Sequence, residues 1–409
     1  MRPLPPRAAR LALFALALGG FGIGTTEFAA MGLLPEIADD LGASIPATGF
    51  AITAYALGVV VGAPTLAALG ARMDRRRLLL WLLVGFTVAN VLSAFAPTLP
   101  TLVGARFLAG LPHGAFFGVG AVMGTAVVGP GRRGRAVSTM MAGLTIACAV
   151  GVPVTAIVGH AVGWRWSFAG VGVIGLLTLL AVTVWVPRLA PMAGATVRSE
   201  LGALRNSQLW IAFGAGAIGF GGMFAVYSYV KPLLTDVTGL SVGVVPLVLA
   251  LYGIGMTVGT VLGGRLADRS VLGTLIGGLV ATIVVLVVIA LVGPYAVPAV
   301  AAIVTLGVTS QVLGLSMQTR LMDVSPAAPS LGAALCHSAL NLGNATGAFL
   351  GGLVIEAGLG YLSPAWVGAG LTTLGLVVVL TVGRRPAPNA VAAPAGAVVR
   401  DDEPELALR

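Results

Sequence analysis

The sequence predicts an all-α integral membrane protein with twelve transmembrane helices in two six-helix halves. The 409-residue chain is 57% hydrophobic and only 9% charged, with a mean hydropathy of +1.01, whereas soluble domains contain about 25% charged residues. Apolar stretches long enough to cross a bilayer, about 20 residues each, recur along the chain. A short charged loop sequence also occurs twice, about half the chain apart.

Twelve apolar stretches are predicted to span the membrane, with Pro marking the short joins at Pro97–Pro100 and Gly293–Pro294. The charged N-terminus resembles a signal peptide, but the first apolar run continues to about Leu34 without a clear cleavage site, so a retained first helix is expected. The expected spans are 11–34, 46–69, 78–96, 101–128, 136–158, 167–186, 209–230, 243–264, 272–292, 296–319, 329–357 and 364–383.

The positive charges predict the orientation of the chain. With the N-terminus in the cytoplasm, all but three of the 23 Lys and Arg residues fall in cytoplasmic segments. The exceptions are Arg165 and Lys231 outside and Arg106 within a span. This bias predicts that both termini are cytoplasmic. It also accounts for the net charge of +9 without a nucleic-acid partner.

An internal repeat predicts the domain organisation. "GARMDRRRLLL" follows the second span and "GGRLADRS" follows the eighth. The expected units are an N-terminal half (1–187), a cytoplasmic linker (188–208), a C-terminal half (209–385) and a disordered cytoplasmic tail (386–409). Parallel halves of this kind place a substrate site between them, near the middle of the membrane.

The sequence disfavours an enzyme and a cofactor. The two cysteines, Cys148 and Cys336, lie in apolar spans and suggest neither a disulfide nor a metal site. There are only three histidines, with no HExxH or CxxC, and no GxxxxGK[ST] loop for ATP. No metal and no cofactor are therefore expected.

Four segments resemble the major facilitator superfamily, in its group of drug:proton antiporters. "GTTEFAAMGLLPEIADDLGAS" (24–44) is similar to the opening of the branch that includes chloramphenicol-resistance exporters and arabinose-type sugar exporters. "GGRLADR" (263–269) resembles the loop motif of the superfamily, "RFLAGLPHG" (106–114) its fourth-helix motif, and "GVPVTAIVG" (151–159) the fifth-helix motif of antiporters. The resemblance covers nearly the whole chain.

The resemblance implies a proton-coupled exporter of small amphipathic molecules that works by alternating access. Chloramphenicol-like antibiotics are the first expected substrates, and sugars or nucleosides the next. Proton-coupled uptake of a sugar or nucleoside is the alternative, because it uses the same fold. The superfamily also implies a monomer in the bacterial inner membrane, in contact with lipid.

Residues for gating follow from the same motifs, and one position departs from the pattern. The second-half loop carries Asp268 before Arg269, but Ala71 occupies the corresponding position of the first half. The charge network expected to close the cytoplasmic side would then depend on Asp74 or on the second-half loop. The expected gating residues are Arg72, Asp74, Arg75, Gly151, Pro153, Gly264, Asp268 and Arg269.

Glu27, Arg106 and His113 are the candidates for proton coupling. A carboxylate in a transmembrane helix costs about 3 kcal/mol on insertion scales and usually faces the protein interior. Gly20 and Gly24 share a helical face with Glu27, which suggests close helix packing there. Arg106 is predicted at a similar depth, so it could pair with Glu27. A structural ion pair, a carboxylate at headgroup level, and a packing role for His113 are the alternatives.

Substrate contacts are expected from polar and aromatic stripes. His337, Asn341 and Asn344 share one helical face, although hydrogen bonds between helices are the alternative role. Phe220, Phe224 and Tyr227 could form an apolar pocket wall, or they could serve packing. Gln311 is a further polar candidate.

Overall fold

The computed structural model of the chain describes residues 5–70, 73–128, 133–188, 204–325 and 329–381. Within these ranges it contains helices and no strands, and twelve helices are long and apolar enough to cross a membrane, which confirms the predicted fold class. The spanning helices are α1 (Pro6–Gly32), α4 (Phe50–Leu69), α5 (Arg75–Ala94), α6 (Leu99–Val128), α7 (Arg133–Ile146) continued by η1 (Ala147–Gly151) and α8 (Val152–Val162), α9 (Trp164–Trp185), α11 (Ser207–Tyr227), α13 (Val245–Arg269), α14 (Val271–Val292), α15 (Ala296–Asp323), α16 (Pro329–Glu356) and α17 (Ser363–Thr381).

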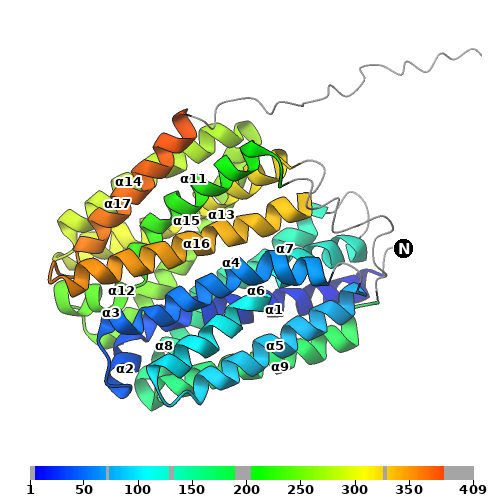
Figure 1. The fold of residues 1–409 in the computed structure, drawn as a ribbon, viewed down its shortest axis with the longest axis horizontal. Coiled ribbons are helices and arrows are strands. Elements are labelled where there is room, and N and C mark those ends of the chain that lie inside the picture. The colour runs from blue at the N-terminus through cyan, green and yellow to red at the C-terminus, as the bar shows by residue number, and fades with distance from the viewer. Residues whose placement is uncertain (1–4, 71–72, 129–132, 189–203, 326–328, 382–409) are drawn as a thin grey trace, which may run out of the picture.

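Several short helices gather at one end of the molecule, opposite the N-terminus (Figure 1). They connect the first span to the second and the seventh to the eighth. We call this end the α2–α12 end. Its helices are α2 (Leu34–Asp40), α3 (Ile45–Thr48), α12 (Val230–Pro232), η2 (Leu233–Val237) and η3 (Val242–Val244).

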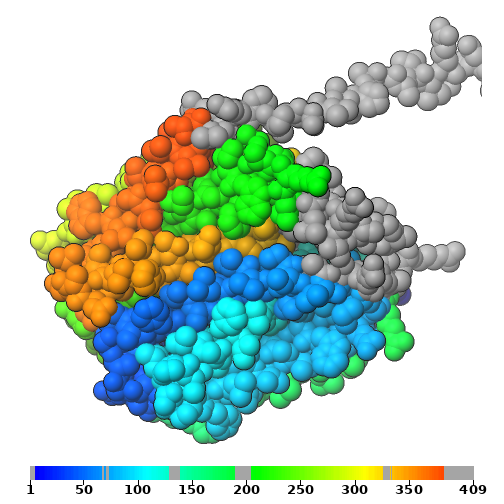
Figure 2. Space-filling model, in the orientation of Figure 1, coloured from blue at the N-terminus to red at the C-terminus, as the bar shows by residue number. Residues whose placement is uncertain are grey.

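The spanning helices form two bundles that meet mainly where α4 packs against α16 and where the fifth span packs against α13. In the first bundle, α4 and α5 pack against α6, and α1 packs against α7 and α9; in the second, α11 packs against α16 and α17, and α13 against α15. Between the bundles, α4 lies beside α16 (Figure 1). On the other side of the interface, η1 and α8 lie beside α13. Figure 2 shows the α4 and α16 surfaces in contact along the visible face. Most of the predicted linker and tail, 189–203 and 382–409, lies outside the described residues.

Glycines bring α4 and α6 unusually close together. A Cβ atom added at Gly110 would lie 2.0 Å from the Tyr55 carbonyl oxygen, and one added at Gly62 would lie 2.0 Å from the Leu111 carbonyl oxygen. Small residues at such crossings allow two backbones to touch. This contact places Tyr55 of α4 beside the polar residues of α6.

The fifth span contains a π-helical turn, η1, immediately before Pro153. Proline has no N–H to donate to the preceding turn, and single π turns in α-helices are often found at functional sites. A Cβ atom added at Gly151 would lie 2.2 Å from Thr25 Oγ1, and one added at Gly253 would lie 2.4 Å from the Ala149 nitrogen. The π turn therefore packs against α1 on one side and against α13 of the second bundle on the other.

Candidate functional site

Glu27 lies at the interface between the two bundles. Its side chain is buried, with 6% of the residue exposed, and the side chain of Asn341 on α16 is a polar neighbour of its carboxylate. The glycine face of α1 directs it there, because a Cβ atom added at Gly24 would lie 2.9 Å from Ala147 of η1. The carboxylate of the first bundle thus meets the predicted amide stripe of the second.

Arg106 of α6 binds the residue next to Glu27. Its Nη1 donates to Thr26 Oγ1 and its Nη2 to the Thr26 carbonyl oxygen, both at 2.8 Å. The guanidinium also lies 4.4 Å from the centre of the Tyr55 ring and 5.1 Å from that of Phe168. Thr26 Oγ1 in turn donates to Asn90 Oδ1 at 2.5 Å. Arg106 is therefore fixed by two hydrogen bonds and two aromatic rings.

The sequence allowed a direct ion pair between Glu27 and Arg106, which the described residues do not show. The ion pairs found in the described part of the chain do not include one between these side chains. The reason is geometric: successive residues of a helix point in directions about 100° apart, and Arg106 approaches the Thr26 side of α1.

His113 and His337, predicted for separate roles, are in contact across the bundle interface. Their ring centroids are 5.6 Å apart, and His337 stacks on Phe117 at 4.9 Å with nearly parallel planes. The Nδ1 atom of His113 makes a 3.0 Å hydrogen bond with the Tyr55 hydroxyl. Tyr55, which was not predicted from the sequence, therefore orients the His113 ring towards the second bundle.

The amide stripe on α16 has unused hydrogen-bonding capacity. Asn341 Nδ2 donates to the His337 carbonyl oxygen at 3.1 Å. Both polar atoms of the Asn344 side chain, together with Asn341 Oδ1, Ser338 Oγ and the Tyr227 hydroxyl oxygen, are buried without a hydrogen-bond partner. Leaving buried polar groups unpaired costs about 1–3 kcal/mol each. Such groups are suited to a ligand that supplies hydroxyl or amide partners.

Aromatic side chains from both bundles form a cluster that includes Tyr227. Phe28 of α1 stacks on Phe224 at 6.3 Å and contacts Tyr227 edge to face at 5.6 Å. Tyr227 stacks on Tyr252 of α13 at 4.2 Å. Phe224 and Tyr227 were predicted from their spacing. Phe28 and Tyr252 were not predicted from the sequence, and Tyr252 is the single aromatic residue of its span.

Phe220 and Gln311, two further predicted substrate contacts, lie against glycines of the second bundle. Phe220 is buried inside the second bundle, where its Cβ atom would lie 2.9 Å from a Cβ added at Gly343 of α16. Gln311 of α15 is half-buried, and its carbonyl oxygen faces Gly263 of α13. Their part in substrate binding stays a prediction.

The predicted gating residues in the loops form no described charge network. Arg72 lies outside the described residues. Asp74 caps α5 by accepting the Arg77 N–H at 3.0 Å, while Asp268 and Arg269 are exposed at the end of α13. Ion pairs among the described residues do not involve these side chains.

The remaining gating predictions lie within helices. Arg75 is buried in the first turn of α5, and Gly264 of α13 faces the Leu315 side chain. Gly151 and Pro153 bracket the transition from η1 to α8, which places both at the contact with α1 and α13. Their part in gating stays a prediction.

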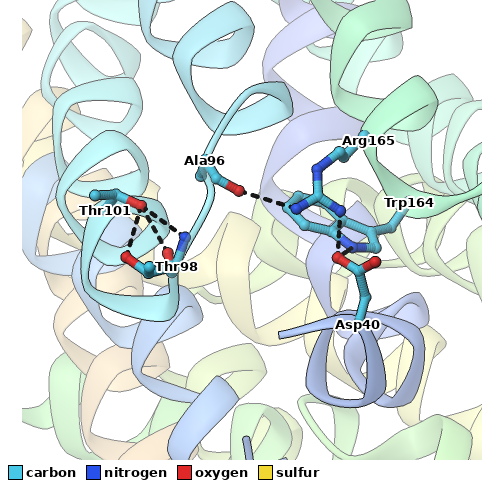
Figure 3. Close-up of polar contacts among 6 residues, drawn as sticks. All are labelled: Asp40, Ala96, Thr98, Thr101, Trp164 and Arg165. Carbon is cyan, nitrogen blue, oxygen red and sulfur yellow. Dashed lines mark hydrogen bonds and ion pairs between the residues drawn. The ribbon is translucent and has the colours of Figure 1, made fainter. Parts of the chain in front are cut away.

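The described ion pairs lie instead at the α2–α12 end. Figure 3 shows Asp40 of α2 beside Arg165, which donates to its Oδ2, and beside Trp164, whose Nε1 donates to the same oxygen at 3.1 Å. Arg165 also donates to the Ala96 carbonyl oxygen at 3.1 Å. The hydrogen bond from Arg165 lowers the pKa of the Asp40 carboxyl below its usual value. This cluster joins elements of the first bundle only.

Unlike the Asp40 cluster, another group of charged residues at this end joins the two bundles. Lys231 of α12 donates to Glu36 Oε1 of α2, and His160 Nδ1 of α8 lies 3.5 Å from the same oxygen. Lys231 is the only lysine of the chain, and only 4% of it is exposed. Its position outside the membrane was predicted from the sequence, but its partner was not.

Comparisons with known proteins identify a family and several similar transporters. The family model described as Major Facilitator Superfamily matches residues 16–330 and 228–401. The inner membrane transport protein YdhP of Escherichia coli (strain K12) is 41% identical over 373 residues, covering 91% of this chain and 96% of that protein. The putative transporter AraJ of the same strain is 34% identical (91% and 95% covered), and a chloramphenicol resistance protein of Streptomyces lividans is 32% identical (90% and 95% covered).

Proposed function

This chain belongs to the Major Facilitator Superfamily, and from that premise we propose that it exports small amphipathic molecules from the bacterial cytoplasm in exchange for protons. It is a multi-pass membrane transporter and not an enzyme. The similarity to a chloramphenicol resistance protein favours phenicol-like substrates. The similarity to AraJ makes sugars the next class to test.

The observation that carries the proposal is the contact between Glu27 and Asn341 across the bundle interface. A carboxylate in a membrane protein that is buried next to a moving interface can bind and release a proton. When the bundles separate, Glu27 exchanges its polar neighbour for water. Its affinity for a proton then depends on the conformation, which is the requirement for coupling proton movement to transport.

Arg106 lies beside the proton-binding carboxylate of Glu27 without forming an ion pair with it. Its two hydrogen bonds to Thr26 hold a positive charge near Glu27 but leave the carboxylate free to accept a proton. His113 is held by Tyr55 and contacts His337, and it provides a second titratable group at the interface between the bundles. We assign Glu27 to proton binding, Arg106 to its electrostatic setting and His113 to proton relay.

The substrate would bind where the unpaired polar groups and the aromatic rings meet. Asn341 and Asn344 supply donors and acceptors, Tyr227 supplies a hydroxyl, and Phe28 and Phe224 supply apolar surface. Mixed apolar and polar lining of this kind is typical of small-molecule sites. It suits a neutral or zwitterionic molecule with hydroxyl or amide groups and an apolar part.

The distribution of Arg residues supports cytoplasmic termini, which would place the α2–α12 end on the periplasmic side of the inner membrane. In the structure this end is closed by contacts of α2 and α3 with α12 and α16. The transport cycle would open it to release substrate and to admit a proton to Glu27.

Proton release from energised everted membrane vesicles tests the proposal. Phenicols, sugars and nucleosides are added in turn to vesicles that contain the wild type, Glu27→Gln or the matched control Glu356→Gln, which removes an exposed carboxylate at the end of α16. Export predicts that one class dissipates the pH gradient with the wild type and the control, but not with Glu27→Gln.

Two other results would contradict the proposal. Equal responses of the wild type and Glu27→Gln would remove Glu27 from proton coupling. Proton-linked movement only when substrate is loaded inside the everted vesicles would indicate uptake instead of export.

A further inference from the structure

A single buried cation links the two bundles at the α2–α12 end. Lys231 belongs to α12, which directly follows the first span of the second bundle, and Glu36 belongs to α2, which directly follows the first span of the first bundle. Only 5% of the Lys231 side chain and 19% of the Glu36 side chain are exposed. The two residues thus occupy equivalent places in the two bundles and meet across the interface.

The charges of Lys231 and Glu36 are compensated mainly by each other. Glu36 Oε1 accepts from Lys231 and lies 3.5 Å from His160 Nδ1, while Glu36 Oε2 is buried without a hydrogen-bond partner. The other acids of α2 do not compete, because Asp40 is engaged by Arg165 and Asp39 is exposed. Lys231 therefore pairs with one carboxylate, that of Glu36, which lies in the other bundle.

Such a pair favours one conformation of the transporter over the other. While α2 and α12 touch, each charge compensates the other in a poorly hydrated place, and removing one partner leaves an unpaired buried charge. When the bundles separate at this end, water reaches both charges and their mutual attraction is largely screened. A group that interacts differently with two states shifts the balance between them.

We propose that Lys231 and Glu36 form a clasp that holds the α2–α12 end of the transporter closed. The clasp positions the bundles and does not bind substrate. This inference goes beyond the proposed function, since it requires neither the proton step at Glu27 nor a particular substrate. It rests on that function only for the side of the membrane at which the clasp lies.

A native cysteine can report opening at this end. Cys148 lies in η1 and is fully buried. A Cβ atom added at Gly253 of α13 would lie 2.4 Å from the Cys148 carbonyl carbon, so α13 of the second bundle covers it. Separation of η1 from α13 would expose the Cys148 thiol, and the substitution Cys336→Ala would leave it as the only cysteine of the chain.

The experiment measures the rate at which a membrane-impermeant maleimide labels Cys148 in sealed right-side-out and inverted vesicles. The Cys336→Ala background is compared with Glu36→Gln, with Lys231→Met and with the exchanged pair Glu36→Lys/Lys231→Glu. Asp40→Asn is the matched control, because it removes an ion pair at the same end that lies within the first bundle.

The clasp predicts that each single substitution raises the labelling rate from one side of the membrane by about tenfold, the scale of coupling measured for close charge pairs. The exchanged pair should return the rate close to that of the background, and Asp40→Asn should leave it unchanged. Because labelling requires no substrate and no proton gradient, the result is independent of the transport assay.

Unchanged labelling in both single variants, or an equal rise in Asp40→Asn, would overturn the proposal. If neither single variant folds, as judged by size-exclusion chromatography, the exchanged pair decides. It must fold and be labelled as slowly as the background, and faster labelling or failure to fold would also overturn the clasp.

Discussion

His113 of α6 and His337 of α16 face each other across the bundle interface, with ring centroids 5.6 Å apart. Both are buried, and the Tyr55 hydroxyl fixes the first while Phe117 stacks on the second. Because the two rings belong to different bundles, any rocking of the bundles must change their separation. The pair therefore connects the proposed proton site to the conformational change.

We expect the effects of substitutions at His113 and His337 to be non-additive. Residues in contact typically show interaction energies of about 0.5–3 kcal/mol in double-mutant cycles. Transport rates of His113→Asn, His337→Asn and the double variant, measured in proteoliposomes, give this interaction energy. If the double variant loses the product of the two single losses, the contact has no part in transport.

Thr26→Val should destabilise the protein by about 1–3 kcal/mol, because it leaves two buried polar groups unpaired. The substitution removes the hydroxyl that accepts from Arg106 Nη1 and donates to Asn90 Oδ1. Thermal unfolding in detergent measures the change. Thr25→Val is the control, since the Thr25 hydroxyl bonds only the Phe21 carbonyl oxygen of its own helix. Equal shifts in both variants would contradict the role of Thr26.

Gly110→Ala should disturb the contact between α4 and α6 and lower both stability and transport. The added methyl would lie 2.0 Å from the Tyr55 carbonyl oxygen, so the two backbones must move apart, at a cost of about 1–3 kcal/mol. Gly104→Ala on the same helix has no neighbouring atom within 4 Å and serves as the control. A thermal stability of Gly110→Ala equal to that of Gly104→Ala would show that the contact yields without strain.

Asp40→Asn should lower thermal stability slightly at neutral pH and not at all in acid. Arg165 lowers the pKa of Asp40 from 3.8, so the unfolded chain binds this proton more tightly than the folded protein. The stabilisation is therefore complete above the unfolded pKa and is lost as the pH falls through the lower folded value. Since 45% of the Asp40 side chain is exposed, the expected loss is below about 1 kcal/mol.

Thermal unfolding of the wild type and Asp40→Asn between neutral pH and about pH 3 checks this dependence. The two curves of stability against pH should converge in acid. Asp39→Asn is the control, because Asp39 is exposed and makes no ion pair with the described residues. A difference that persists unchanged in acid would rule out the Asp40 carboxylate as its source.

The spans could be predicted because hydrophobic length is a local property of the sequence. Each predicted span, such as 272–292, corresponds to a helix found in the structure, here Val271–Val292. The inward position of Glu27 could also be predicted, since Gly20 and Gly24 lie on its face and pack against the fifth span. The partner of Arg106 could not, because the direction in which a side chain approaches a neighbouring helix depends on how the two helices are rotated.

The sequence by itself determined that this chain crosses the membrane twelve times, and it identified Glu27, Arg106 and the polar stripe of α16 as exceptional residues in apolar surroundings. Hydropathy and helical period are sufficient for that, because both act over a few turns of one helix. Only the tertiary structure decided which of these residues meet. It paired Arg106 with Thr26, His113 with His337, and Lys231 with Glu36, because these contacts join helices far apart in the sequence and are set by close packing at glycines such as Gly110 and Gly253.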